Sequence, residues 1–327
     1  MSQARRRRFL IASGALLVAP LAHAQQAGKV RRVGMLVTSL PKGGARYVEA
    51  TKAGLRERGW IEGKNLVIDL RHAGGKTDRF PELAAEIVAA KPDVIFATTY
   101  LAVLAVTDQT DAIPVVFAAI SDPVKTGLVK KLSRPGGQLT GVALGAVPLA
   151  GKRIEILKDA LPQLARVAVL YDSARQGEAG LTELREAAAH LGVALIEVGA
   201  GSGEEIEQAF AQIRIRKAEA LLVPGSIRFV VQKHRIIALA QRHRLPAIYE
   251  FLDWVDEGGL IAYGPDYETG FRRAAYHIDR ILRGTPAGDL PIEEAMRYEL
   301  VVNLKTARAL GVTISQTVLL RADRVIE

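Results

Sequence analysis

The amino-acid sequence predicts an α/β protein of two similar lobes, each built on a doubly wound parallel sheet, joined by a multi-strand hinge. Three observations predict this fold class. The order strand, helix, strand, helix, strand, helix, strand occurs in residues 31–120 and again in 167–251. The tripeptide LRE occurs at 55–57 in the first half and at 184–186 in the second. A chain of 327 residues, 49% hydrophobic and 24% charged, is also long and apolar enough for two cores.

Extended apolar runs predict four strands in the first half of the chain, at residues 31–39, 65–73, 94–99 and 114–120. The spacing of apolar residues predicts a helix over 44–58, which Gly59 closes as a C-cap. Thr77 is predicted to cap the next helix, which runs to Ala90, and a short helix is predicted to start near Leu101.

The second half repeats this alternation. Strands are predicted at 167–172, 194–199, 220–225 and 246–251, and helices at 149–160, 178–191, 203–215 and 229–243. An extended segment at 260–265 precedes a predicted helix over 267–283. Residues 298–303 are predicted to form a strand and 304–310 a short helix capped by Gly311. The pattern leaves open which lobe these last pieces join.

The stretch 114–144 links the two halves. It begins as a buried-type strand and breaks at 121–123, Ser-Asp-Pro, a turn that places a carboxylate at the end of the strand. A second break at 134–137, Arg-Pro-Gly-Gly, precedes an extended apolar pattern over 140–144. We interpret this stretch as the first crossing between the lobes.

The N-terminus has the pattern of a cleavable leader at residues 1–24. Four arginines at 5–8 precede an uncharged, mostly apolar run at 9–21 and the cleavage pattern Ala22-His23-Ala24. The apolar run is shorter than the roughly 20 residues of a membrane span. The arginines resemble a twin-arginine signal, and an ordinary secretory signal remains an equal alternative. Either route predicts a periplasmic protein, whose net charge falls from +9 to +5 without the leader's four arginines.

Several chemistries lack support in the sequence. The chain has no cysteine, which excludes disulfides, thiolate metal sites, a cysteine nucleophile and a lipidated cysteine. The sequence contains no phosphate-binding glycine loop, no zinc-binding H-E-x-x-H and no G-x-S-x-G, and its six histidines are scattered. Basic clusters with interleaved aromatic residues are also absent. We therefore expect no cofactor, no metal, no catalytic residue and no nucleic-acid partner, although separated members of a Ser-His-Asp site are not excluded.

Polar side chains follow the ends of the predicted strands. In parallel sheets these ends share one edge, where ligands bind. Helix N-termini there suit a carboxylate, a carboxylate such as Asp122 or Glu250 suits an ammonium group, and tyrosines supply an apolar wall. Each of these residues has a plainer alternative as a helix cap, a turn former or a packed ring. The predicted ligand-binding residues are Ser39, Thr98, Thr99, Ser121, Asp122, Tyr171, Ser226, Glu250, Tyr263 and Asp266.

Two runs of sequence resemble a known family. The first is SDPV at 121–124 with RPGG at 134–137 and TGV at 140–142, and the second is YGPDY at 263–267 with NLKTA at 303–307. Together they resemble the ABC transporter substrate-binding proteins of the tryptophan/tyrosine-binding type.

This resemblance implies a type I periplasmic-binding-protein fold that clamps a ligand between its lobes. It places Thr98, Thr99, Asp122, Tyr171 and Tyr263 at contact positions. One departure is VPGS at 223–226, where many relatives have a Thr-Asp-Asn-like turn. This turn has no carboxylate that could bind an amino group, which argues against an amino-acid ligand.

The resulting hypothesis is an exported solute-binding protein of an ABC import system, without catalysis, that delivers a small molecule to a membrane permease. The ligand would be an amino acid or an aromatic or other carboxylate compound. Lobe 1 is expected to comprise 28–143 and about 266–292, and lobe 2 to comprise 144–265 and about 293–327, in a monomer. A sensing module for a membrane receptor and a hydrolase remain alternatives. A sugar-repressor-like regulator is disfavoured, because a leader stands where DNA-binding helices would be.

Overall fold

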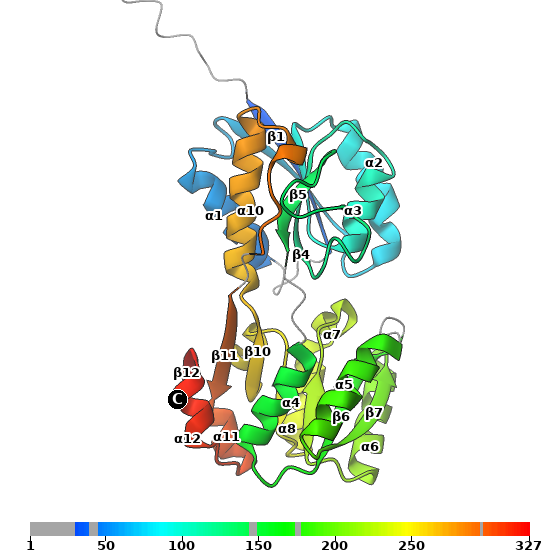
Figure 1. Ribbon diagram of the computed structural model, residues 1–327, viewed down its shortest axis with the longest axis vertical. Helices are drawn as coiled ribbons and strands as arrows, with labels where there is room; N and C mark the ends of the chain where they lie inside the picture. Colours follow the sequence, from blue (N-terminus) through cyan, green and yellow to red (C-terminus); the bar gives the residue numbers. More distant parts are fainter. Residues whose placement is uncertain (1–29, 39–44, 144–148, 174–177, 295–296) are drawn as a thin grey trace, which may run out of the picture.

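The computed structural model describes residues 30–38, 45–143, 149–173, 178–294 and 297–327. The predicted leader and Ser39 lie outside these residues. Two α/β lobes lie one above the other along the long axis of the molecule, each around its own sheet (Figure 1). The C-terminus lies in the same lobe as the second sheet (Figure 1).

The first sheet has five parallel strands in the order β2-β1-β3-β4-β5. This order is a doubly wound topology, in which ligands bind beyond the carboxyl ends of the strands. Its strands are β1 (Arg31–Val37), β2 (Leu66–His72), β3 (Val94–Ala97), β4 (Val115–Ile120) and β5 (Leu139–Ala143).

The second sheet repeats this topology and extends it. Its order is β12-β11-β10-β9-β8-β6-β7, so β7, β6, β8, β9 and β10 correspond in turn to β2, β1, β3, β4 and β5. Strands β11 and β12 are exceptions to the predicted parallel arrangement, because β11 pairs antiparallel with β10 and parallel with β12. The strands are β6 (Arg166–Asp172), β7 (Ala194–Ala200), β8 (Ala220–Val223), β9 (Ala247–Tyr249), β10 (Ile261–Pro265), β11 (Tyr298–Asn303) and β12 (Arg324–Ile326).

Helices cover both faces of each sheet, and four apolar clusters fill the layers between them. On the first sheet, α1 (Ala45–Glu57) and α10 (Tyr267–Leu282) cover one face, and α2 (Phe80–Ala89) and α3 (Tyr100–Thr107) the other. On the second sheet, one face carries α6 (Gly203–Ile215), α7 (Ile227–Val231), α8 (Lys233–Arg242) and α9 (Asp253–Asp256). The other carries α4 (Leu149–Ala160), α5 (Glu178–His190), α11 (Leu304–Leu310) and α12 (Gln316–Arg321).

Helix α10 follows the second sheet in the sequence but packs on the first. The Thr51 hydroxyl donates a hydrogen bond of 3.1 Å to the Phe271 carbonyl, and both groups are buried. Gly54 allows this close packing, because a Cβ there would lie 2.6 Å from the Arg272 carbonyl oxygen. The chain therefore passes between the lobes after β5, after β10 and again between α10 and β11.

The last of these connections is anchored to the first lobe before it reaches β11. Thr140 Oγ1 donates to the Leu290 carbonyl at 3.0 Å, and His277 Nε2 lies 3.1 Å from the Pro291 carbonyl. Arg273 binds Glu293 through two hydrogen bonds of 2.7 and 2.8 Å. These contacts fix the point at which the connection leaves the first lobe.

Most predicted elements are confirmed, with bounds that shift by one or two residues. Thr77 was predicted to cap a helix, but it begins a 3₁₀ turn, Thr77–Arg79, that leads into α2 without a side-chain cap. The helix predicted over 229–243 is two helices, because Gln232 takes a non-helical ψ of 10° between α7 and α8. Helices α9 and α12 and strand β12 were not predicted.

Gly141 provides a first test of the packing of β5 on β4. Its φ is 153°, and a Cβ there would lie 2.1 Å from the Phe117 carbonyl oxygen. We expect Gly141→Ala to lower the free energy of unfolding by about 3 kcal/mol, because backbone must move.

Gly137→Ala is the matched control, with a φ of 62° but no described atom within 4 Å of the added Cβ. Its loss should be about 1 kcal/mol, from backbone conformation alone. Denaturant unfolding followed by circular dichroism would measure both. Equal losses in the two variants would contradict the close contact.

The pH dependence of stability tests the anchored connection. Burial lowers the pKa of His277, and hydrogen bonds from Arg273 lower the pKa of Glu293. A depressed histidine pKa means that the unfolded chain binds the proton more readily, so stability should fall as the pH drops below about 6.5. The stability that the Glu293 carboxylate contributes should be lost only below about pH 4.5.

Thermal unfolding of His277→Gln between pH 7 and pH 4 would check this assignment. An amide can still donate to Pro291 but does not titrate, so the decline between pH 7 and pH 5 should shrink while the later decline remains. An unchanged curve in this variant would exclude His277 as its source.

Candidate functional site

The carboxyl ends of the parallel strands in the two lobes face each other (Figure 1). The chain leaves the first lobe at the end of β5 and leaves the second at the end of β10, which places these ends at the boundary between the lobes. The lobes also touch, because a Cβ on Gly75 of the first would lie 3.2 Å from Val231 Cγ2 of the second. We call the two facing sets of strand ends the strand-end edges.

The first strand-end edge brings together four predicted residues. Thr98 follows β3 and is 7% exposed, and Thr99 caps α3 by accepting a hydrogen bond of 3.3 Å from the Ala102 amide. Ser121 is exposed after β4. The Asp122 carboxylate accepts hydrogen bonds of 3.0 and 2.9 Å from the next amides of its turn. These four side chains present hydroxyls and one carboxylate at the edge.

A strained residue lies at the same edge. Ala119 has a φ of 62° at an irregularity in the pairing of β4 with β5. Residues other than glycine rarely adopt this conformation, and such strain persists only where the surrounding structure imposes it. The irregularity sets the direction in which the chain leaves β4 toward Ser121 and Asp122.

The second strand-end edge holds Tyr171, Asp172 and Ser226. Tyr171 lies over Gly199 of β7, where a Cβ would come within 3.0 Å of the tyrosine Cζ. Asp172 is 3% exposed and accepts a hydrogen bond of 2.6 Å from the Ser226 hydroxyl. Ser226 also caps α7 through the Arg228 amide. Asp172 was not predicted as a site residue, although it ends β6 as Asp122 follows β4.

Glu250 is held by protein groups from several elements. Its carboxylate accepts hydrogen bonds from the Gly225 amide at 3.0 Å and from the Tyr267 hydroxyl at 3.1 Å. Arg153, whose side chain is 3% exposed, lies 3.1 Å from Glu250 Oε2 and donates through Nε to the Tyr263 carbonyl at 2.7 Å. Burial raises the pKa of Tyr267 well above its ordinary value, so its hydroxyl stays a donor.

The VPGS turn explains how this carboxylate fits. A Cβ on Gly225 would lie 2.4 Å from Glu250 Oε1, so only glycine leaves space for the carboxylate at this position. The turn that lacks an acidic residue therefore accommodates one from the neighbouring strand. Arg153 and Tyr267 were not predicted; the YGPDY run contains Tyr267, but no local pattern identifies Arg153.

Two predicted residues remain, Asp266 and Tyr263, and Asp266 lies elsewhere. It caps α10 by accepting hydrogen bonds from the Thr269 amide at 3.1 Å and the Thr269 hydroxyl at 2.5 Å. Tyr263 lies in β10, with its ring centroid 6.4 Å from that of Tyr298. Asp266 lines a cavity whose described lining includes none of Thr98, Asp122, Tyr171 and Ser226.

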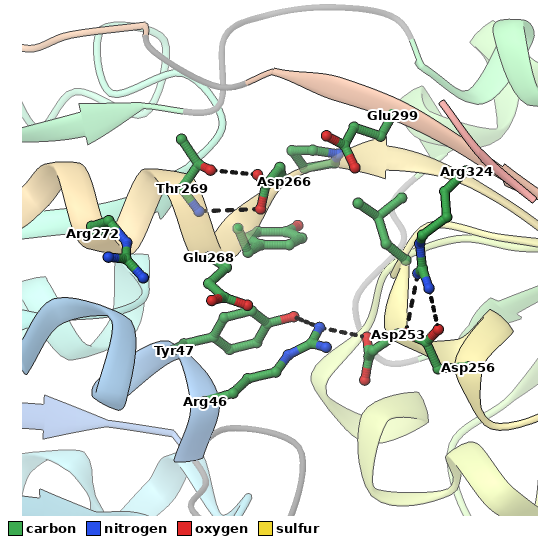
Figure 2. A pocket seen from close by; sticks show the side chains of 13 residues that line it. Arg46, Tyr47, Asp253, Asp256, Asp266, Glu268, Thr269, Arg272, Glu299 and Arg324 are labelled. Atoms are coloured by element: carbon green, nitrogen blue, oxygen red, sulfur yellow. Dashed lines mark hydrogen bonds and ion pairs between the residues drawn. The ribbon is translucent and has the colours of Figure 1, made fainter. Parts of the chain in front are cut away.

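That cavity, which we call the hinge pocket, has a volume of about 370 Å³. It lies beside the connection between β10 and α10, with walls from both lobes (Figure 2). Burial raises the pKa of Tyr47 in its wall to about 12. The lining residues are Arg46, Tyr47, Leu252, Asp253, Asp256, Pro265, Asp266, Tyr267, Glu268, Thr269, Arg272, Glu299 and Arg324.

Within the described ranges, histidine and carboxylate side chains form no group of three or more that could hold a metal ion. In the same part of the chain, every helix is too short or too polar to cross a membrane. The strand-end edges offer hydroxyls, backbone amides and the Asp122 carboxylate, which recognise small polar solutes.

Comparisons with known proteins agree with this description. Residues 42–326 match the family described as ABC transporter substrate binding protein. A tyrosine-binding protein of Clostridioides difficile is 27% identical over 274 residues, which are 83% of this chain and 77% of that protein.

Two solved structures are similar over most of their length. A conserved domain protein from Vibrio cholerae is 27% identical and superposes with a TM-score of 0.82 over 91% of this chain and 100% of that one. The ABC domain from Streptococcus pneumoniae in complex with L-Trp is 25% identical, with a TM-score of 0.81 over 90% and 99%. The predicted type I periplasmic-binding-protein fold is confirmed. The chain belongs to the family of ABC transporter substrate binding proteins.

Proposed function

We propose that this chain is exported to the periplasm, binds a small solute between its two lobes and delivers it unaltered to a membrane permease. The lobes would be 28–143 with about 266–292, and 144–265 with about 293–327, in a monomeric protein. The packing of α10 on the first sheet and of β11 on the second supports these boundaries.

The observation that carries the proposal is the position of the strand-end edges. The carboxyl ends of the strands of two separate sheets face one another, and the chain passes between the lobes three times (Figure 1). A solute that contacts both edges would stabilise the closed arrangement, because those contacts exist in full only when the lobes meet.

Amino acids are the first ligand class that we propose, because relatives are named for tyrosine binding and solved with L-Trp. Glu250 already has three protein partners, so Asp122 is the better carboxylate for a ligand ammonium group. The amide end of α3, capped by Thr99, suits a ligand carboxylate. Tyr171 would supply an apolar wall, and aromatic or aliphatic acids are the second class.

A thermal-shift screen of the mature chain would test this function. Amino acids, nucleosides, and aromatic and aliphatic acids form the panel. A solute at 100 times its dissociation constant should add about 2.7 kcal/mol to stability. The same solute should make the protein more compact in small-angle scattering. A panel without any shift or compaction would contradict the proposal.

The variant Thr98→Val tests whether the solute binds at the first strand-end edge. This variant keeps the side-chain volume but removes a hydroxyl at the first edge. The loss of one hydrogen bond should weaken the solute found in the screen by about 2- to 10-fold. Thr107→Val, at the opposite end of α3, is the matched control and should bind as the wild type does. Equal binding by both variants would remove Thr98 from the site.

The role of Glu250 as a structural anchor can be tested by unfolding measurements. Glu250→Ala leaves Arg153 buried without a counter-charge, so we expect a loss of about 3 kcal/mol. The double variant Arg153→Met/Glu250→Leu removes both charges and should lose much less. Glu268→Ala, in the hinge pocket, is the control and should change stability little. A double variant as unstable as Glu250→Ala would contradict the buried ion pair.

A further inference from the structure

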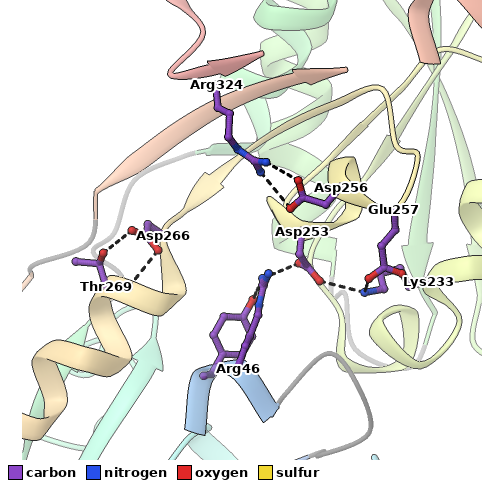
Figure 3. Close-up of polar contacts among 9 residues, drawn as sticks. Arg46, Lys233, Asp253, Asp256, Glu257, Asp266, Thr269 and Arg324 are labelled. Carbon is purple, nitrogen blue, oxygen red and sulfur yellow. Dashed lines mark hydrogen bonds and ion pairs between the residues drawn. The ribbon is translucent and has the colours of Figure 1, made fainter. Parts of the chain in front are cut away.

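An ion pair joins the two lobes beside the hinge pocket. Arg46, the second residue of α1, belongs to the first lobe, and Asp253, the first residue of α9, belongs to the second. Arg46 Nη2 lies 3.0 Å from Asp253 Oδ1 (Figure 3). Their side chains are 36% and 13% exposed, so the pair is partly shielded from water.

Both partners are oriented by groups of their own lobe. The Arg46 guanidinium lies 4.6 Å from the centre of the Tyr47 ring and donates a hydrogen bond of 2.6 Å to the Tyr47 hydroxyl. Asp253 Oδ2 accepts a hydrogen bond of 3.1 Å from Lys233, whose side chain is 6% exposed and also binds Glu257. Asp253 therefore presents its other oxygen to Arg46 without reorganisation.

Two other ion pairs that include residues lining the hinge pocket do not cross between the lobes. Arg272 of α10 binds Glu57 of α1 at 2.6 Å, and both helices cover the first sheet. Arg324 of β12 binds Asp256 of α9, and both elements belong to the second sheet (Figure 3). The separation of the lobes would break Arg46–Asp253 and leave these two pairs intact.

The crossing pair also lies apart from most of the predicted solute contacts. The described lining of the hinge pocket includes Asp266 but none of Thr98, Asp122, Tyr171 and Ser226. The Tyr267 ring, 5.8 Å from that of Tyr47 and 5.6 Å from that of Phe251, forms the pocket's aromatic wall. A contact at this place would stabilise closure without touching a solute that is held by those four residues.

We propose that Arg46 and Asp253 form a latch that favours the closed arrangement of the lobes before any solute binds. The inference rests on the opening and closing of the lobes in the proposed function. A latch of this kind sets the fraction of the free protein that is closed. It thereby tunes apparent affinity for every solute by the same factor, since only the closed form makes the full set of contacts.

The test measures the ligand-free protein. Because the chain contains no cysteine, Glu82→Cys on α2 and Gln208→Cys on α6 introduce two exposed labelling sites without background. Single-molecule energy transfer between the labels reports the ratio of open to closed molecules. Arg46→Met keeps the aliphatic stem and leaves Asp253 paired with Lys233, so no buried carboxylate loses its last partner.

We expect Arg46→Met to raise the open-to-closed ratio by about five-fold, the upper range for a partly exposed pair. Adding Asp253→Asn to this variant should change the ratio no further. Raising the salt concentration from about 0.05 M to about 0.5 M should open the wild type but not Arg46→Met. Arg272→Met, the matched control, should keep the wild-type ratio.

A wild-type ratio in Arg46→Met, or equal changes in Arg46→Met and Arg272→Met, would overturn the latch. Since the measurement needs no solute, its outcome is independent of the ligand screen. A chain that binds no solute would refute the proposed function and leave the latch intact. A chain that binds solute with an unchanged ratio would refute the latch alone.

Discussion

The packing of α10 against α1 is the contact on which the arrangement of the molecule depends. α10 follows the second sheet in the sequence, yet its apolar face covers the first, with the Thr51 hydroxyl bound to the Phe271 carbonyl. This return makes the chain pass between the lobes three times. Three connections restrict two bodies to far fewer relative motions than a single linker does. The facing strand ends are thereby kept opposite each other.

Three carboxylates at the boundary between the lobes have protein partners. Glu250 is bound by Arg153, Asp172 by Ser226, and Asp253 by Lys233. Carboxylates held in this way orient the groups around them. Hydroxyls and the Asp122 carboxylate lie at the strand-end edges. Groups that are positioned in advance need little rearrangement when a solute arrives, which lowers the free-energy cost of binding.

The sequence predicted the parts of the fold that depend on local pattern. Apolar runs located the repeated strands, Gly311 marked the end of α11, and polar residues after the strands marked the strand-end edges. The parts it missed depend on distant contacts. Arg153 lies in an ordinary helical pattern and gains its role only from Glu250, 97 positions later in the numbering. Asp266 follows a strand as the other predicted residues do, but the turn into α10 directs it to the hinge pocket.

The distance along the chain between Thr51 and Phe271, 220 residues, has a consequence for biosynthesis. The face of β1, β3 and β4 that α10 covers stays open until that helix has left the ribosome. The N-terminal half therefore keeps an exposed apolar surface until α10 has been synthesised. Residues 149–265, in contrast, can begin to fold as they emerge. Contacts of such long range slow folding and expose intermediates to aggregation. Shielding of the first half during synthesis would therefore lower the risk of aggregation.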